Sequence, residues 1–275
     1  MPPVPEQRPQ SFQEYVALIE NHQAATRPLW CRGCGRAAYK LAPSWCRHRD
    51  KKSSTELARR EERIMLRFRQ RSIPLVPRPL GDDWDALFFM QHYGIPTRLL
   101  DWTENPFIGF YFAVMSAEFK AVRPRNSKTR VLRFKEDAAV WVLDPIVWNA
   151  HALRFQSFDR GVLSTTDEAL NPYKPPAGST DEHNLPLAIY GAHNSPRIIA
   201  QRGAFTIFGH NGLSMEELYD RDEFPPTSLT KIILGKDLLP AMRRSILGHG
   251  ITESLVFPDL DGLAREIKRD FQFED

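Results

Sequence analysis

Apolar residues recur at the spacing of an amphipathic helix in several stretches of the chain. Residues 11–25, SFQEYVALIENHQAA, carry an apolar stripe behind Ser11, which suits the N-cap position. Residues 55–72, TELARREERIMLRFRQRS, place Leu57, Ile64 and Met65 at helical intervals between charged residues. The same criteria predict further helices over residues 82–94, 107–119, 240–250 and 261–271.

Short apolar runs bounded by Gly or Pro indicate strands between these helices. The clearest run is AAVWVLDP, residues 138–145, which ends at a proline. Residues 1–10 are predicted to be a disordered tail, and residues 167–196, rich in Pro, Asn, Ser and Gly, a long loop. The mixture predicts a single α+β domain over residues 11–275, with helical additions at its N-terminal end. Other predicted strands lie at residues 28–35, 97–103, 197–209, 231–235 and 254–259.

The composition adds only broad limits to this picture. The 275 residues are 42% hydrophobic and 26% charged, as in a globular protein, and their net charge is +3. This mild excess of positive charge permits a nucleic acid or an anionic cofactor as a partner without requiring one. The longest apolar runs are too short for a membrane span, and the N-terminus lacks a signal-peptide pattern. Because three cysteines cannot all pair, we expect a protein of the reducing cytoplasm.

The stretch QHYGIPTRLLDWTENP, residues 91–106, gathers polar side chains directly before a predicted helix. Gly94 ends the preceding helix, and Pro96 keeps the chain extended. A turn that leads into a helix N-terminus favours an anionic ligand. In the alternative interpretation, Arg98 and Asp101 form a structural pair and Thr103, or Asn105, only caps the helix. Alternation along the strand predicts one face with Thr97, Leu99, Asp101 and Thr103, and another with Arg98, Leu100 and Trp102.

A second polar cluster lies in LWCRGCGRAAYKLAPSWCRHRD, residues 29–50. The guanidinium of Arg32 can fork onto a phosphate or a carboxylate, and Gly33 beside it permits close approach of a ligand to the backbone. The rival interpretation is a tetrahedral zinc site. Its second half, Cys-x-His, is an unusual ligand pair, so we expect no metal here. The four zinc ligands would be Cys31, Cys34, Cys46 and His48.

Several of these motifs together resemble the FRG domain family, and they follow one another in the same order. They are CRG with YKLAPS behind it, QHYGIPTRLLDWTENP with YFA after it, AQRGAFTIFG, and GITESLVFPDLDGLA. The likeness runs from about residue 11 to residue 268, although Cys31 replaces the aromatic residue of the Phe/Tyr-Arg-Gly triplet that names the family. The resemblance implies a bacterial effector or toxin, of the kind found in anti-phage defence, with a layout similar to that of ADP-ribosyltransferases.

A layout of this kind implies an ADP-ribosyltransferase-like β core and NAD as a substrate. Transfer from NAD breaks the bond between nicotinamide and ribose through a cation-like state, which a carboxylate must stabilise. Glu253, the one acidic residue of the predicted strand TESLVF, is preferred to Asp101 for this role. The residues implied at the site are Arg32, Gly33, Tyr93, Thr97 and Arg98 for NAD binding, and Glu253, Asp101, Thr103 and Gln201 for catalysis.

Two other classes of function stay open. The first is a nucleic-acid-binding or nucleolytic effector without NAD chemistry, in which Arg32, Arg98 and the basic residues 58–71 contact phosphates. The second is an interaction module whose polar cluster is a buried structural network. For the enzyme we expect a nucleic acid or protein target, an antitoxin-type partner, and no membrane association.

Overall fold

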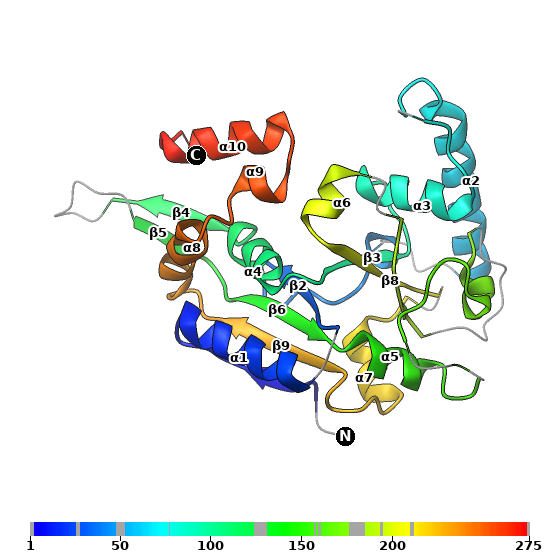
Figure 1. The fold of residues 1–275 in the computed structure, drawn as a ribbon, viewed down its shortest axis with the longest axis horizontal. Coiled ribbons are helices and arrows are strands. Elements are labelled where there is room, and N and C mark those ends of the chain that lie inside the picture. Colours follow the sequence, from blue (N-terminus) through cyan, green and yellow to red (C-terminus); the bar gives the residue numbers. More distant parts are fainter. Residues whose placement is uncertain are drawn as a thin grey trace.

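A seven-stranded sheet forms the centre of the protein (Figure 1). The computed structural model describes residues 3–25, 28–47, 53–76, 78–123, 131–156, 158, 161–175, 185–192, 195–209 and 212–273. The strand order is β1 (Glu6–Gln7), β9 (Leu229–Leu234), β6 (Ala138–Leu143), β2 (Trp30–Cys34), β3 (Leu99–Thr103), β8 (Gly203–Ile207) and β7 (Leu187–Ile189). The β1–β9 pair is parallel and the others are antiparallel, so the sheet is mixed.

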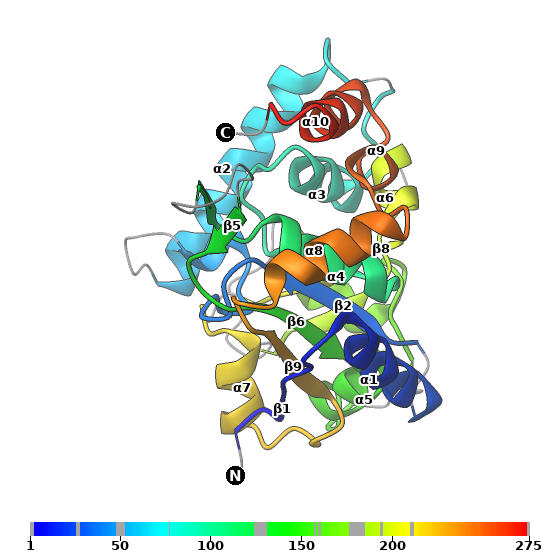
Figure 2. The same ribbon diagram turned by 90° about the vertical axis from the view of Figure 1, so that its left-hand side faces the viewer.

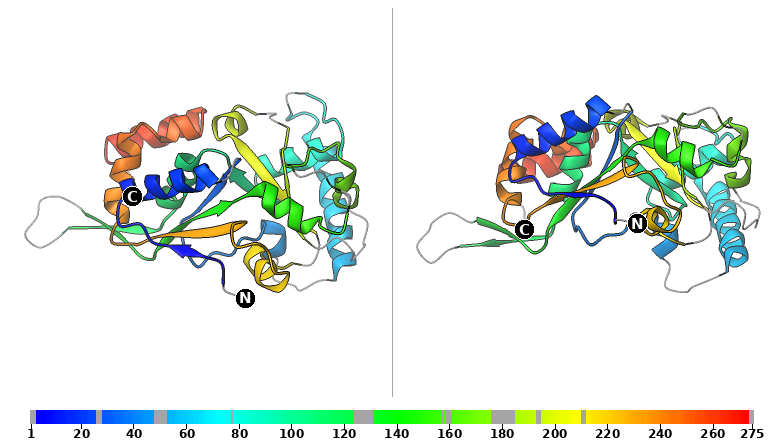
Figure 3. Two further views of the ribbon diagram at one scale, coloured as in Figure 1. Left: turned by 60° about the horizontal axis from the view of Figure 1, so that its bottom comes forward. Right: turned by 90° about the horizontal axis from the view of Figure 1, so that it is seen from below.

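A separate antiparallel pair, β4 (Phe119–Val122) with β5 (Val131–Phe134), projects from the body (Figure 3). The helices are α1 (Phe12–Ala25), α2 (Ser54–Ser72), α3 (Asp83–His92), α4 (Pro106–Met115), α5 (Pro145–Ala152), α6 (Pro196–Ala200), α7 (Met215–Arg221), α8 (Leu239–Gly248), α9 (Glu253–Val256) and α10 (Leu260–Asp270), with 3-10 turns at Ser44–Arg47 and Glu168–Tyr173. Within the described residues, every helix is too short or too polar to cross a membrane.

Three core clusters fix the layers. The first packs α1, α4 and α8 against β2, β6 and β9, and the second packs α3 and α6 against β3, β8 and β7. The third covers the opposite face of the whole sheet with α5 and α7, which Figures 1 and 2 place away from α8, α9 and α10. Strand alternation explains the division, because Cys31 and Leu99 enter the first and second clusters while Trp30 and Leu100 enter the third.

Two glycines let α4 lie directly on β2. A Cβ atom at Gly33 would stand 2.0 Å from the carbonyl oxygen of Gly109, and a Cβ at Gly109 would stand 2.7 Å from the Cβ of Cys31. Both distances are below van der Waals contact, so no larger side chain fits at this crossing without moving the backbone. Helix α4 begins with Pro106, and Asn105 is its N-cap, since the Asn105 Oδ1 accepts a hydrogen bond from the Phe107 N–H at 3.0 Å.

The α+β class and most elements follow the sequence prediction. The structure confirms the helices expected at 11–25, 55–72, 82–94, 240–250 and 261–271 and the strands expected at 28–35, 97–103, 138–145 and 231–235, with ends shifted by one or two residues. The helix expected over 107–119 ends earlier, at Met115, and β4 begins at Phe119. Gly94 has the positive φ of 72° that a helix-stop glycine adopts.

Other elements differ from the prediction. The expected tail over residues 1–10 is wrong, because β1 pairs with β9. The strand expected over 197–209 begins instead as α6, because the Ser195 Oγ caps it by accepting from the Ile198 N–H at 3.2 Å. The strand expected over 254–259 is wrong, since α9 forms there. The loop expected over 167–196 contains one 3-10 turn and β7, and its residues 176–184 lie outside the described residues.

Candidate functional site

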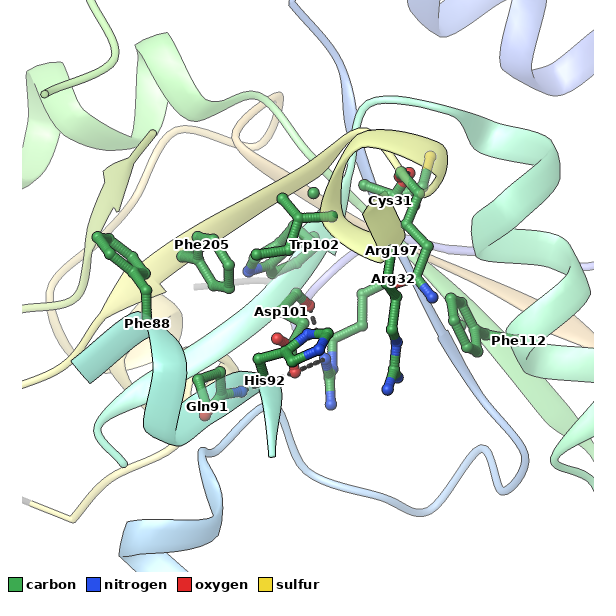
Figure 4. Close-up of a pocket in the computed structure, with 15 residues that line it drawn as sticks. Cys31, Arg32, Phe88, Gln91, His92, Asp101, Trp102, Phe112, Arg197 and Phe205 are labelled. Carbon is green, nitrogen blue, oxygen red and sulfur yellow. Dashed lines mark hydrogen bonds and ion pairs between the residues drawn. The ribbon is translucent and has the colours of Figure 1, made fainter. Parts of the chain in front are cut away.

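A cleft opens on the sheet between the two groups of helices. Its volume is about 240 Å³. Strands β2 and β3 form its floor, and α3, α4 and α6 supply its walls (Figure 4). It therefore lies where the first core cluster gives way to the second. The lining residues are Cys31, Arg32, Gly33, Phe88, Gln91, His92, Asp101, Trp102, Thr103, Phe112, Arg197, Ile198, Gln201, Gly203 and Phe205.

The floor is concave because β2 and β3 separate there. They share one residue pair, Cys31 with Thr103, and the register would next oppose Gly33 to Asp101. Instead, the Arg32 side chain enters the opening, and its Nη1 donates a hydrogen bond to the Asp101 backbone carbonyl at 2.6 Å. A guanidinium thus replaces a backbone ladder bond and is held at the base of the cleft.

The Asp101 carboxylate is oriented but accessible. Its Oδ2 accepts a hydrogen bond from the Gln91 Nε2 at 2.8 Å and lies 3.8 Å from the Arg32 Nη1. Gln91 is oriented in turn by the Thr97 hydroxyl, which donates to its Oε1. The Asp101 side chain is still 57% exposed. Since an exposed ion pair of this length contributes at most about 1 kcal/mol, a ligand can compete for both charges.

A second arginine, Arg197 on α6, enters the cleft from the other wall. Its guanidinium lies 4.7 Å from the centre of the Phe257 ring, a cation–π contact. With the described residues it forms no hydrogen bond or ion pair. Burial lowers the pKa of Arg197 while Asp101 raises it, and a guanidinium stays charged despite such a shift. Arg197 can therefore offer its donors to an anion.

His92 completes the polar end of the cleft. Burial, and then the charge of Arg197, lower the pKa of His92 below 6.5, against an opposing effect of Asp101. Its imidazole is therefore neutral at neutral pH and can accept a proton. The Nδ1 lies 3.4 Å from the Ser195 Oγ. In Figure 4, Arg32, His92, Asp101 and Arg197 converge from four different elements, with Phe88, Phe112 and Phe205 farther along the walls.

Five of the nine residues implied by the sequence line this cleft: Arg32, Gly33, Asp101, Thr103 and Gln201. The Thr103 hydroxyl donates to the Gln201 backbone carbonyl at 2.5 Å, and the Gln201 Nε2 donates to the Val256 carbonyl at 3.0 Å, so both groups hold the cleft's structure. The close approach permitted by Gly33 is to helix α4, not to a ligand. Thr97 is buried behind Gln91, and Tyr93 is exposed outside the cleft.

Arg98 is an architectural residue, which corrects its expected role in binding NAD. It is fully buried, and its Nε donates to the Glu61 carboxylate at 2.8 Å. Its Nη1 and Nη2 donate to the backbone carbonyls of Phe208 at 2.6 Å and Tyr173 at 2.9 Å. The guanidinium therefore ties three separate segments together behind the cleft and cannot reach a ligand. The proposed Arg98–Asp101 structural pair is likewise wrong, because alternation sends the two side chains to opposite faces.

Glu253 is also outside the cleft. It begins helix α9, not a strand, and its side chain is buried against Arg269 of α10, whose Nε donates to both carboxylate oxygens at 2.9 and 3.0 Å. Glu253 therefore fastens α10 to the body. Asp101 is the one carboxylate among the described residues that line the cleft.

Cys31 is separated from Cys34 by the sheet. Cys31 lies in the first core cluster and Cys34 in the third, on opposite faces of the sheet, so the two sulfurs of the Cys-x-x-C motif cannot hold one metal ion. His48 lies outside the described residues. Burial raises the pKa of the Cys31 thiol to about 12, which keeps it protonated and a poor nucleophile at neutral pH.

Sequence reasoning missed Arg197, His92 as a lining residue, and the aromatic walls. The only available signal for Arg197 was the Ser-Pro pair before it, which predicts a helix start where a strand was expected. His92 stands in the central motif, but the motif alone gives it no partner, because its neighbours Arg197 and Ser195 are about a hundred residues away along the chain.

Comparison with known proteins supports the family resemblance over part of the chain. The model of the FRG domain matches residues 27–121. The extension of this family to residues 11–275 stays a prediction. A search of curated proteins and a search of solved structures gave no significant match. The matched range supplies Arg32, Gln91, His92 and Asp101, whereas Arg197 comes from outside it.

Proposed function

We propose that this FRG-domain protein binds NAD in the cleft and transfers its ADP-ribosyl group to a nucleic acid or protein. The observation that carries the proposal is the half-exposed Asp101 carboxylate, set between Arg32 and Arg197 in a cleft with aromatic walls. Two guanidiniums suit a pyrophosphate, and Phe88, Phe112 or Phe205 offers a surface for a flat ring. The relation of the sheet to an ADP-ribosyltransferase core is part of this proposal.

The chemistry assigns each group a step. The bond between the nicotinamide nitrogen and ribose C1′ breaks, and its electron pair leaves with nicotinamide. Positive charge then develops on the ribose, where the fixed carboxylate of Asp101 stabilises it more in the transition state than in the bound substrate. The acceptor attacks C1′ and loses a proton, which the neutral His92 can take. If water is the acceptor, the products are ADP-ribose and nicotinamide.

The test separates binding from turnover. Arg32→Ala and Arg197→Ala should each remove a charge-assisted contact of about 1.5–3 kcal/mol, which raises the Kd for NAD by about 10- to 150-fold. Asp101→Asn keeps an acceptor for Gln91, so NAD affinity should change little while kcat falls about 100-fold or more. Asp220→Asn, an exposed carboxylate on α7, is the matched control. Wild-type protein that releases no nicotinamide, with cell extract as a source of acceptor, would refute the proposal.

A second candidate function is metal-independent cleavage of a phosphodiester. The specific observation in its favour is the neutral His92 beside Arg197, because a proton acceptor next to a phosphate-binding cation suits that reaction. Shortening of RNA or DNA without nicotinamide release, abolished by His92→Gln, would favour this candidate over NAD chemistry.

The effector or toxin role implied by the FRG resemblance is part of the same proposal. Expression of the wild-type chain in a bacterial cytoplasm should arrest growth, and Asp101→Asn should relieve the arrest at equal protein levels. If both proteins arrest growth equally, toxicity does not arise from the cleft. A partner protein that neutralises the toxicity can be identified by its ability to restore growth when it is expressed together with the wild-type chain.

A further inference from the structure

Helix α2 has two sides with opposite character. Leu57, Ala58, Glu61 and Met65 are buried on the inner side, where Met65 joins the second core cluster. Five arginines lie on the outer side, within an arc of about 120° at roughly 100° per residue. We call them the arginine ridge: Arg59, Arg60, Arg63, Arg67 and Arg71. Figures 1 and 2 place α2 along the outer edge of the molecule, and four of these arginines line one hollow of its surface.

The arginines with a structural role in this part of the protein have acidic partners, whereas the ridge does not. Arg69 pairs with Asp83 at 2.9 Å, Arg78 with Asp85 at 2.8 Å, and buried Arg98 with Glu61 at 2.8 Å. Among the described residues, no hydrogen bond or ion pair reaches a ridge arginine. Glu56, the one acidic residue on this side of α2, takes part in the capping box with Ser53.

This arrangement works against the helix itself. Arg59, Arg63, Arg67 and Arg71 follow one another at intervals of four residues, and like charges at that spacing repel on a helix surface. Within the part of the chain that the structure describes, no acidic side chain pairs with these arginines, and α2 is held to the core by its inner side. A polyanion laid along the ridge would remove the repulsion.

We propose that the arginine ridge binds the phosphate backbone of a nucleic acid. The twelve residue-to-residue steps from Arg59 to Arg71 span about 18 Å of helix, the axial rise of roughly five phosphates of one strand. Arginine forks suit phosphate oxygens, and contacts of this kind do not depend on sequence. A membrane is a poorer match, because an interfacial helix must expose its apolar side and that side of α2 is buried in the core. The ridge does not depend on the NAD proposal, and it would supply the substrate class if the acceptor is nucleic acid.

The test is the salt dependence of binding, measured by fluorescence anisotropy without NAD. Labelled single-stranded RNA, single-stranded DNA and duplex DNA are titrated between about 50 and 200 mM salt. The double variant Arg63→Gln/Arg67→Gln should reduce the slope of log K against log salt by about 1.8 for the duplex or about 1.4 for a single strand. It should also weaken binding about tenfold or more near 0.1 M salt. The arm that binds most tightly identifies the type of nucleic acid.

The matched control removes the same charge elsewhere. Arg244→Gln/Lys268→Gln changes two exposed cations on α8 and α10, at the opposite end of the molecule from α2 (Figure 1). Its affinity and salt slope should match those of the wild type. An equal loss in both double variants would mean that binding follows net charge, and wild-type affinity in Arg63→Gln/Arg67→Gln would mean that the ridge is not used. Either result overturns the proposal, as does the absence of binding in all three arms.

Discussion

Replacement of the buried Arg98 by methionine should lower the free energy of unfolding far more than the same replacement of any surface arginine. Methionine keeps the length and much of the volume of the side chain but removes the charge. It leaves the Glu61 carboxylate, which is 2% exposed, without its guanidinium, and it leaves the carbonyls of Phe208 and Tyr173 without their Arg98 donors. Removal of one partner of a buried ion pair costs about 3–5 kcal/mol. For a chain of this size, that corresponds to a fall in Tm of about 6–20 °C.

A double-mutant cycle separates the ion pair from the other contacts of Arg98. Glu61→Leu alone buries an arginine without its carboxylate, so it should also cost about 3–5 kcal/mol. In Arg98→Met/Glu61→Leu neither charge of the pair is left, and the lost hydrogen bonds from Arg98 to the two carbonyls cost about 1 kcal/mol each. The double variant should therefore be more stable than either single variant. The coupling energy should be about 4 kcal/mol or more, because two single losses of at least about 3 kcal/mol each exceed a double loss of about 2 kcal/mol.

The assay is urea unfolding followed by circular dichroism at constant pH, with Arg36→Met as the control. Arg36 pairs with Glu136 at the surface, and loss of such a pair should cost no more than about 1 kcal/mol. Additive effects of Arg98→Met and Glu61→Leu, or a loss no larger than that of Arg36→Met, would refute the architectural role of Arg98. The folded Arg98→Met protein should still bind the cleft's ligand, because Arg98 does not line the cleft.

Three further predictions address the site and its support. Glu253→Gln should lower stability by about 3 kcal/mol in urea unfolding through the loss of a buried ion pair, and it should leave the kcat of the proposed NAD reaction unchanged in the folded protein. Gly33→Ala should destabilise the protein by about 1–3 kcal/mol or more and so lower its Tm, because the added Cβ would overlap the backbone of α4. NMR titration should give His92 a pKa below 6.5, and Arg197→Ala should raise it. Since the unfolded state binds this proton more readily, His92 should reduce stability as the pH falls below 6.5 and have no such effect above it.

The central motif illustrates what local pattern can establish. Strict alternation through TRLLDWT placed Asp101 and Arg98 on opposite faces, and the structure has them there. Alternation does not say which face is accessible, because that depends on which helices cover each face. The sequence prediction therefore gave Arg98 a ligand-binding role. Its partner, Glu61, is 37 residues away along the chain, so the local pattern could not reveal the pair.

The two carboxylates show a similar limit. The segment TESLVF is short and apolar enough to suit a strand, yet a four-residue helix forms in it, fixed by the pairing of Glu253 with Arg269 and by the packing of α10. Arg197 was hidden for the same reason, since α6 has only five residues and no helical periodicity can develop over that length. Helices α6 and α9, which periodicity missed, have five and four residues, whereas the helices that it identified have ten or more.

Because only one residue pair joins β2 and β3, the sheet consists of two parts, called panels here, that meet at these two strands. One panel contains β1, β9, β6 and β2, and the other contains β3, β8 and β7. The tryptophan-rich third core cluster is continuous across the junction of the panels on the far side, with Trp30 and Trp141 in one panel and Trp102 in the other. The tilt between the panels, and with it the distance from Arg32 to Arg197, therefore depends on packing in the third core cluster. A change of side-chain volume at Trp30 or Trp141, which belong to that cluster and do not line the cleft, should alter the affinity of the cleft for its ligand.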